Sequence, residues 1–142
     1  MPSSLRKKWL FAPLYLPFLG LIGACMDEKE HSSASYDEVR TIVEANCAGC
    51  HTGGARAPRL TGDLCADIVS APSFQSSLLL ITPGEPRNSY LLHKLWGTQK
   101  SVGGLGNNMP PAGNLAEEEI RRIESWVKAG AVCFRNEDTG SE

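Results

Sequence analysis

Two cysteines and a histidine stand together at one point of the chain, in the run Cys47-Ala48-Gly49-Cys50-His51. The spacing C-x-x-C-H is typical of covalent haem attachment. Two thiols at this spacing can add across the two vinyl groups on one side of a porphyrin. The histidine that follows can then present a ring nitrogen to the iron. The motif therefore predicts one haem c, bound through Cys47 and Cys50, with His51 as the proximal iron ligand.

Two other uses of the same cysteines have to be weighed. A thioredoxin-like redox pair needs a strand followed by a helix, and the sequence shows no such context. A zinc site needs two more ligands, such as Cys65 and Cys133, but these lack the paired spacing of zinc-binding cysteines. Haem attachment is the interpretation that the spacing favours.

Two residues further along the chain could bind the iron from the distal side of the haem. Met109 follows a glycine-rich stretch and precedes Pro110 and Pro111, which fix the backbone beside it. A thioether is a soft iron ligand that raises the haem potential. A buried, gap-filling methionine is the alternative. His93 is the competing ligand, but a histidine beside Lys94 in a helix is more often a surface residue.

The first residues predict export. Positive residues at 6–8 precede an uncharged run from 10 to 24, which is too short to span a membrane and is followed by Cys25. The ending Leu-Ile-Gly-Ala-Cys resembles a bacterial lipobox, which implies a lipoprotein signal peptide at 1–24 and a lipid on Cys25. An ordinary secretory signal, leaving Cys25 as a free thiol, is the alternative. Met26, in place of Asp after the cysteine, favours anchoring at the periplasmic face of the outer membrane.

Two cysteines remain once haem and lipid are assigned. Exported proteins enter an oxidising compartment, where spare thiols tend to pair. We therefore expect a Cys65–Cys133 disulfide, with two buried free cysteines as the alternative.

Hydrophobic periodicity predicts an all-α domain. Helices are expected from Ser35 to Cys47, at 63–70, at 90–96 and at 117–129. Ser35 and Glu38 have capping-box spacing. The other expected caps are Asn88 or Ser89 for the third helix, and Asn114 with Glu117 for the last. Residues 25–34 are expected to be a flexible tether, 35–134 the domain and 135–142 a disordered tail.

Several further side chains are expected around the haem. The aromatic residues are interpreted as core or as pocket wall: Tyr36, Phe74, Tyr90, Trp96 and Trp126. Backbone preceding Pro58 could orient His51. Arg56 and Arg59 could pair with haem propionates, although loop arginines are more often solvated.

The motifs taken together resemble the cytochrome c family. The matching segments are Cys47–His51, Pro83–Pro86 with Ser89–Leu91, Met109–Pro111, Glu118–Ile120 with Trp126–Val127, and Gly130–Ala131. In particular they resemble small bacterial modules with a Met-Pro-Pro turn. The resemblance covers about 36–133 and implies a cytochrome c fold, with Met109 as the distal ligand.

The function expected from these features is electron transfer by a carrier that is not an enzyme. Its partners would be a redox protein and, through the lipid, a membrane. The net charge of -2, with 21% charged residues, argues against nucleic-acid binding. A haem enzyme or gas sensor with an open iron site is one rival, and a lipoprotein without haem is another.

Overall fold

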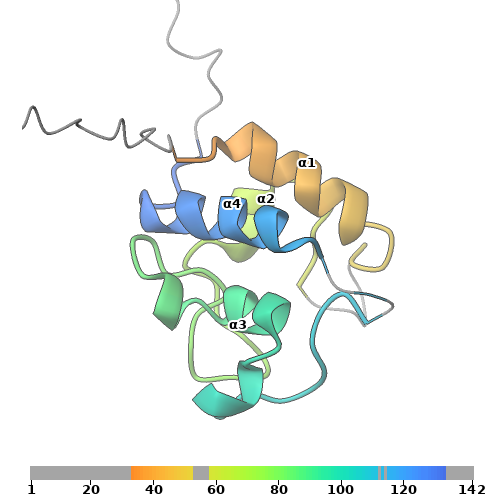
Figure 1. Ribbon diagram of the computed structural model, residues 1–142, viewed down its shortest axis with the longest axis vertical. Helices are drawn as coiled ribbons and strands as arrows, with labels where there is room; N and C mark the ends of the chain where they lie inside the picture. The colour runs from red at the N-terminus through yellow and green to blue at the C-terminus, as the bar shows by residue number, and fades with distance from the viewer. Residues whose placement is uncertain (1–32, 53–57, 112, 114, 134–142) are drawn as a thin grey trace, which may run out of the picture. The chain divides into compact units, whose positions relative to one another are not determined.

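The structure is a computed structural model that describes residues 33–52, 58–111, 113 and 115–133. The expected signal peptide, Cys25, nearly all of the tether and the tail lie outside these residues. Four α-helices and two short 3-10 helices follow one another (Figure 1): α1 Tyr36–Asn46, α2 Leu64–Ile68, η1 Pro86–Asn88, α3 Tyr90–Trp96, η2 Gln99–Val102 and α4 Glu117–Lys128. The described residues contain only isolated β-bridges, such as Val69–Ile81, so the all-α expectation is confirmed.

Helix α1 begins where the sequence predicts. Ser35 Oγ accepts a hydrogen bond from the amide of Glu38 at 3.3 Å, and Glu38 Oε2 accepts one from the amide of Ser35 at 2.8 Å. This reciprocal pair satisfies two amides that the first helical turn leaves without partners. The capping box therefore fixes the start of the helix that leads to the Cys-x-x-Cys-His motif.

The core lies where α1 packs against α4, side by side in Figure 1. The ring of Tyr36 lies 6.5 Å from that of Trp126, measured between centroids. Trp126 is buried, and its Nε1 donates to the carbonyl of Val132 at 2.9 Å. Removal of this apolar surface from water supplies most of the stabilisation at the contact. The buried residues of the two helices are Tyr36, Val39, Ile42, Val43, Ile120, Ile123, Trp126 and Val127.

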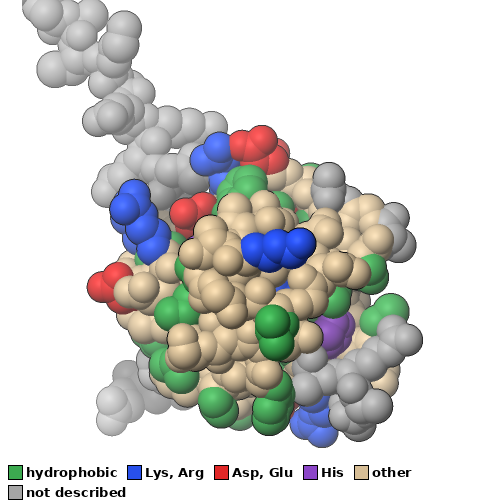
Figure 2. Space-filling model, turned by 90° about the horizontal axis from the view of Figure 1, so that it is seen from below, with side chains coloured by type: hydrophobic (Ala, Val, Ile, Leu, Met, Phe, Trp, Pro, Cys, Tyr) green, Lys and Arg blue, Asp and Glu red, His purple; other side chains and the backbone are tan. Residues whose placement is uncertain are grey.

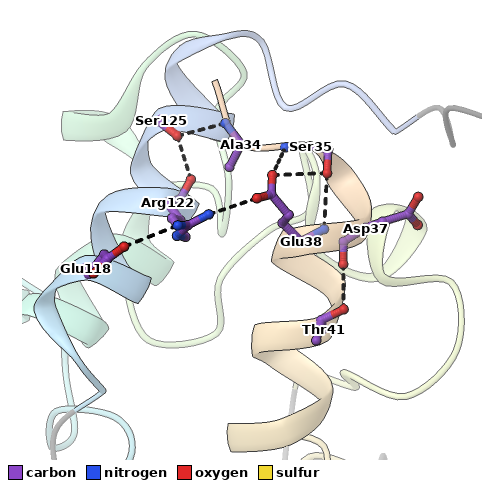
Figure 3. A network of polar contacts seen from close by, with 8 residues as sticks. All are labelled: Ala34, Ser35, Asp37, Glu38, Thr41, Glu118, Arg122 and Ser125. Carbon is purple, nitrogen blue, oxygen red and sulfur yellow. Dashed lines mark hydrogen bonds and ion pairs between the residues drawn. The ribbon is translucent and has the colours of Figure 1, made fainter. Parts of the chain in front are cut away.

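A polar seam runs along the edge of the same contact (Figure 3). Arg122 of α4 donates to Glu38 of α1 at 2.8 Å and to Glu118 of its own helix at 3.2 Å. The amide of Ala34 donates to Ser125 Oγ at 3.1 Å. The seam thus ties the start of α1 to the middle of α4.

One expected cap is wrong, and another lacks its side-chain hydrogen bond. Helix α4 begins at Glu117 with Ala116 as its N-cap, and Glu119 accepts from the amide of Ala116 at 3.2 Å. Asn114, the expected cap, lies outside the described residues. Ser89 does precede α3, but its hydroxyl makes no cap. It accepts from the amide of Thr82 at 2.9 Å, because the buried turn before the helix competes for it.

The aromatic expectation is wrong for Phe74, whose side chain is 85% exposed. Trp96 is also partly exposed and lies under the guanidinium of Arg121, 5.8 Å from its ring centroid. Figure 2 shows separate hydrophobic side chains on the underside of the molecule, with few acidic groups among the described residues there. Loops on this side of the core therefore leave some apolar side chains in solvent.

Candidate haem site

The end of α1 presents the Cys-x-x-Cys-His motif. Cys47 is the C-cap, and its amide donates to Val43 O at 2.8 Å. The amides of Cys50 and His51 then both donate to Cys47 O, at 3.1 and 3.0 Å. One tight turn therefore gathers the two thiols and the imidazole at the helix end. Both thiols are free; Cys47 is half-buried against the core and Cys50 is exposed.

The Cys47 thiol has the wrong setting for a redox-active pair. Burial raises the pKa of the Cys47 thiol, and the nearby Glu119 carboxylate raises it further. Reactive cysteine pairs have a lowered pKa, commonly at a helix N-terminus, where the dipole favours the thiolate. Here the motif follows a helix C-terminus. The thioredoxin-like alternative is therefore not supported.

The imidazole of His51 is fixed by one hydrogen bond. Its Nδ1 lies 2.9 Å from the carbonyl oxygen of Pro58, and a carbonyl can only accept, so Nδ1 carries the proton. The amide of Leu60 also donates to His51 O at 2.8 Å. The sequence suggested that backbone preceding Pro58 would orient His51. The acceptor is instead the carbonyl of Pro58 itself. Nε2 is left as the nitrogen able to bind iron.

Met109 lies against the end of α3. Its amide donates to Lys94 O at 2.9 Å, and its side chain is partly buried. A pocket of about 350 Å³ lies between the end of α3 and the start of α4, and both Asn108 and Leu115 line it. The apolar residues Leu95, Trp96, Leu115 and Ile120 line this pocket, together with Gly97, Asn108 and Glu117. Met109 is not itself one of the lining residues; its neighbour Asn108 is.

The other candidate ligands and propionate partners have different roles. His93 is engaged at both ring nitrogens, with Nδ1 2.8 Å from Thr98 Oγ1 and Nε2 2.9 Å from Arg87 O. Coordination of iron would break one of these contacts. Arg59 pairs with Asp67 at 3.4 Å, and Arg56 lies outside the described residues.

Cys65 and Cys133 are bonded to each other. Their Cα atoms lie 6.1 Å apart, within the usual range for a disulfide. The bond ties α2 to the segment that follows α4. Among the residues that the structure describes, no three His, Cys, Asp or Glu side chains gather as a metal site. The zinc alternative therefore lacks a set of ligands.

One buried group beside this site was not expected from the sequence. Lys94 is only 7% exposed and packs with Tyr90, one helical turn earlier on the same face of α3. A spacing of four residues from an aromatic residue placed Lys94 on the inner face. That signal was available, but a lysine next to a histidine was interpreted as part of a solvated surface.

None of the helices in the described part of the chain has the length and apolar character needed to cross a membrane.

Comparison with known proteins identifies the family of the chain. No curated protein and no solved structure matches the chain. A family model described as cytochrome C oxidase, cbb3-type, subunit III, matches residues 34–127. The chain belongs to this family of cytochrome c domains, and its cofactor is covalently bound haem c.

Proposed function

We propose that the protein carries single electrons through one haem joined to Cys47 and Cys50, with His51 and Met109 as the two iron ligands. The observation that carries this proposal is the His51 imidazole, which follows the two thiols and donates from Nδ1 to Pro58 O at 2.9 Å, so that the lone pair on Nε2 is the one able to bind iron. An orienting partner on the other ring nitrogen is the usual arrangement of a metal-ligating histidine. The haem itself supplies the one-electron couple of its iron.

The distal side supports closure of the iron site. Met109 is the only methionine in the domain expected at 35–134, since Met1 and Met26 lie in the leader and the tether. Its amide is held by α3, and the preceding residue, Asn108, lines a pocket that also contains apolar side chains. Because a thioether on the sixth position leaves no open site for substrate, electrons leave and enter through the haem edge. A redox protein is then the partner, and the chain is not an enzyme.

The proposal extends to the compartment. The described domain carries a disulfide, as an oxidising compartment favours. A charged segment, an apolar run and the Leu-Ile-Gly-Ala-Cys ending precede the domain in the sequence. We propose that the protein is exported and held at the periplasmic face of the envelope, in the outer membrane, by a lipid on Cys25.

Replacement of the distal ligand tests the proposed function. The oxidised parent should show the weak far-red sulfur-to-iron charge-transfer band, and reduced parent should bind carbon monoxide slowly. Met109→Ala should lose the band, bind carbon monoxide readily and have a lower reduction potential, because thioether ligation favours the ferrous state. Leu105→Ala is the matched control, since this side chain is exposed in the same loop. It should behave as the parent does.

The opposite result is equally clear. If the parent lacks the band and already binds carbon monoxide quickly, Met109 is not on the iron. The protein would then be an open haem site, suited to an enzyme or a gas sensor. A pyridine haemochrome assay that shows no haem c would contradict the covalent attachment itself.

A further inference from the structure

The loop that leads to Met109 is held by a buried lysine. Lys94 Nζ donates to the carbonyl of Leu105 and to Gln75 Oε1, each at 3.2 Å, and lies 5.9 Å from the ring centroid of Tyr90. No carboxylate of the described residues pairs with this ammonium. Burial lowers the pKa of Lys94. Burying an ammonium among neutral groups opposes folding, so an apolar residue here would be expected to stabilise the domain.

The same residue also holds the proposed iron ligand. Lys94 O accepts from the amide of Met109 at 2.9 Å, while its side chain reaches Leu105. Lys94 therefore contacts both ends of the five-residue segment 105–109. A segment fixed at both ends has few conformations in which its last side chain, that of Met109, moves away from the iron it is proposed to bind.

Other buried groups converge on the same loop. Tyr90 Oη donates to Leu105 O at 2.9 Å, and Gln99 Nε2 donates to Gly106 O at 3.2 Å. At Gly104 any Cβ would collide with the Tyr90 ring and with Gln99 O. The loop thus lies directly on the inner face of α3 and on η2, and Lys94 is the charged member of this set.

We infer that Lys94 is a positioning residue for Met109, fixing the loop at Leu105 so that the sulfur stays on the iron. The inference rests on the proposed His51 and Met109 ligation. It explains why an ammonium is buried where an apolar side chain would pack. Loss of the hydrogen bond from Lys94 to Leu105 should let the loop, and with it Met109, leave more often.

Exchange of the sixth iron ligand measures how often Met109 leaves the iron. Cyanide binds the oxidised holoprotein only after the thioether leaves, so its binding rate reports the fraction of time that the site is open. Lys94→Met keeps the length of the side chain and removes the donor. Because the lost bond is charge-assisted, we expect binding about tenfold faster or more. Lys100→Met is the matched control, since Lys100 is exposed in η2 and only its backbone contacts the loop. It should match the parent.

Each outcome decides the matter. If Lys94→Met binds cyanide no faster than Lys100→Met while the parent shows its sulfur-to-iron band, the positioning role is wrong and Met109 ligation stands. If the parent lacks that band and binds cyanide at once, the proposed ligation fails, and the positioning role with it. Should Lys94→Met yield no holoprotein, Tyr90→Phe removes the other donor to the same oxygen. It should accelerate binding by severalfold, and an unchanged rate would overturn the inference.

Discussion

His51 and Pro58 are joined by a hydrogen bond of 2.9 Å, from the imidazole Nδ1 to a backbone carbonyl seven residues later. The bond fixes both the tautomer and the orientation of the ring at the end of α1. A proton held in this way should exchange slowly with solvent, because exchange requires the bond to open. In the reduced holoprotein, NMR should therefore detect a protected Nδ1 proton on His51. A rapidly exchanging Nδ1 proton, or none, would contradict this geometry.

Cys47 and Cys50 should be needed for folding as well as for haem attachment. The described helices are short, and the porphyrin is expected to complete the apolar centre between them. When a cofactor binds the folded state alone, its binding energy adds to stability. Cys47→Ser with Cys50→Ser should give little stable protein, whereas Cys50→Ser alone retains one thioether and should be intermediate. A cooperative thermal transition in the double variant, like that of the parent, would show that the domain folds without haem.

The Cys65–Cys133 disulfide should stabilise the domain through the chain that it closes. The two cysteines are 68 residues apart, and a loop of this length corresponds to roughly 4 kcal/mol by the chain-entropy estimate. Cys65→Ser with Cys133→Ser should lower the free energy of unfolding by up to this amount in denaturant. Reductant should destabilise the parent to the same level and leave the variant unchanged. Equal stability of the two proteins in oxidising buffer would contradict the role.

Glu38 gives the domain a small dependence on pH. Its pKa is lowered, chiefly by the hydrogen bond from the Ser35 amide, with smaller contributions from the Ser35 hydroxyl and Arg122. Because the pKa of Glu38 is lower in the folded state, its ionised carboxylate stabilises the folded state at pH values above the ordinary pKa of 4.5. This contribution to stability is lost as pH falls through the folded-state pKa. The side chain is about half exposed, so the contribution is less than about 1 kcal/mol.

Glu38→Gln tests this in chemical unfolding at about pH 7 and again as the pH is lowered below the ordinary glutamate value of 4.5. The variant should be less stable than the parent at the higher pH, and the difference should shrink at the lower one. Glu44→Gln is the control, because Glu44 is exposed on the same helix and, among the described residues, pairs only with Arg40 four residues earlier. An undiminished difference for Glu38→Gln at low pH would mean that its charge is not what stabilises the cap.

Local signals explain which features the sequence could predict. The Ser35–Glu38 box and the Cys-x-x-Cys-His turn depend on neighbours within a few residues, and both are present as expected. Ser89 was misjudged because its hydroxyl is bound by a turn that begins seven residues earlier. Phe74 was misjudged because its exposure depends on where a loop lies against the rest of the fold.

Lys94 illustrates a further limit. A lysine is usually a surface residue, and only the position of the loop at 104–106 shows that the carbonyl of Leu105 comes within reach of its ammonium. The position of Met109 in the sequence predicted an iron ligand, but nothing in the sequence indicated what holds it. Groups that act through contacts between distant segments need the fold before they can be identified.

Helix α1 separates two features of the domain, the capping box at its first turn and the Cys-x-x-Cys-His motif after its last. Its first residue follows the point where the chain enters the domain, and its last precedes the two thiols that we propose bind haem. Eleven residues of helix separate these points by about 16 Å. The capped, ion-paired end is joined to α4, which gives the helix a firm base. A domain held at its N-terminal side would therefore have the Cys-x-x-Cys-His motif at the other end of this helix, about 16 Å from the residue where the helix begins.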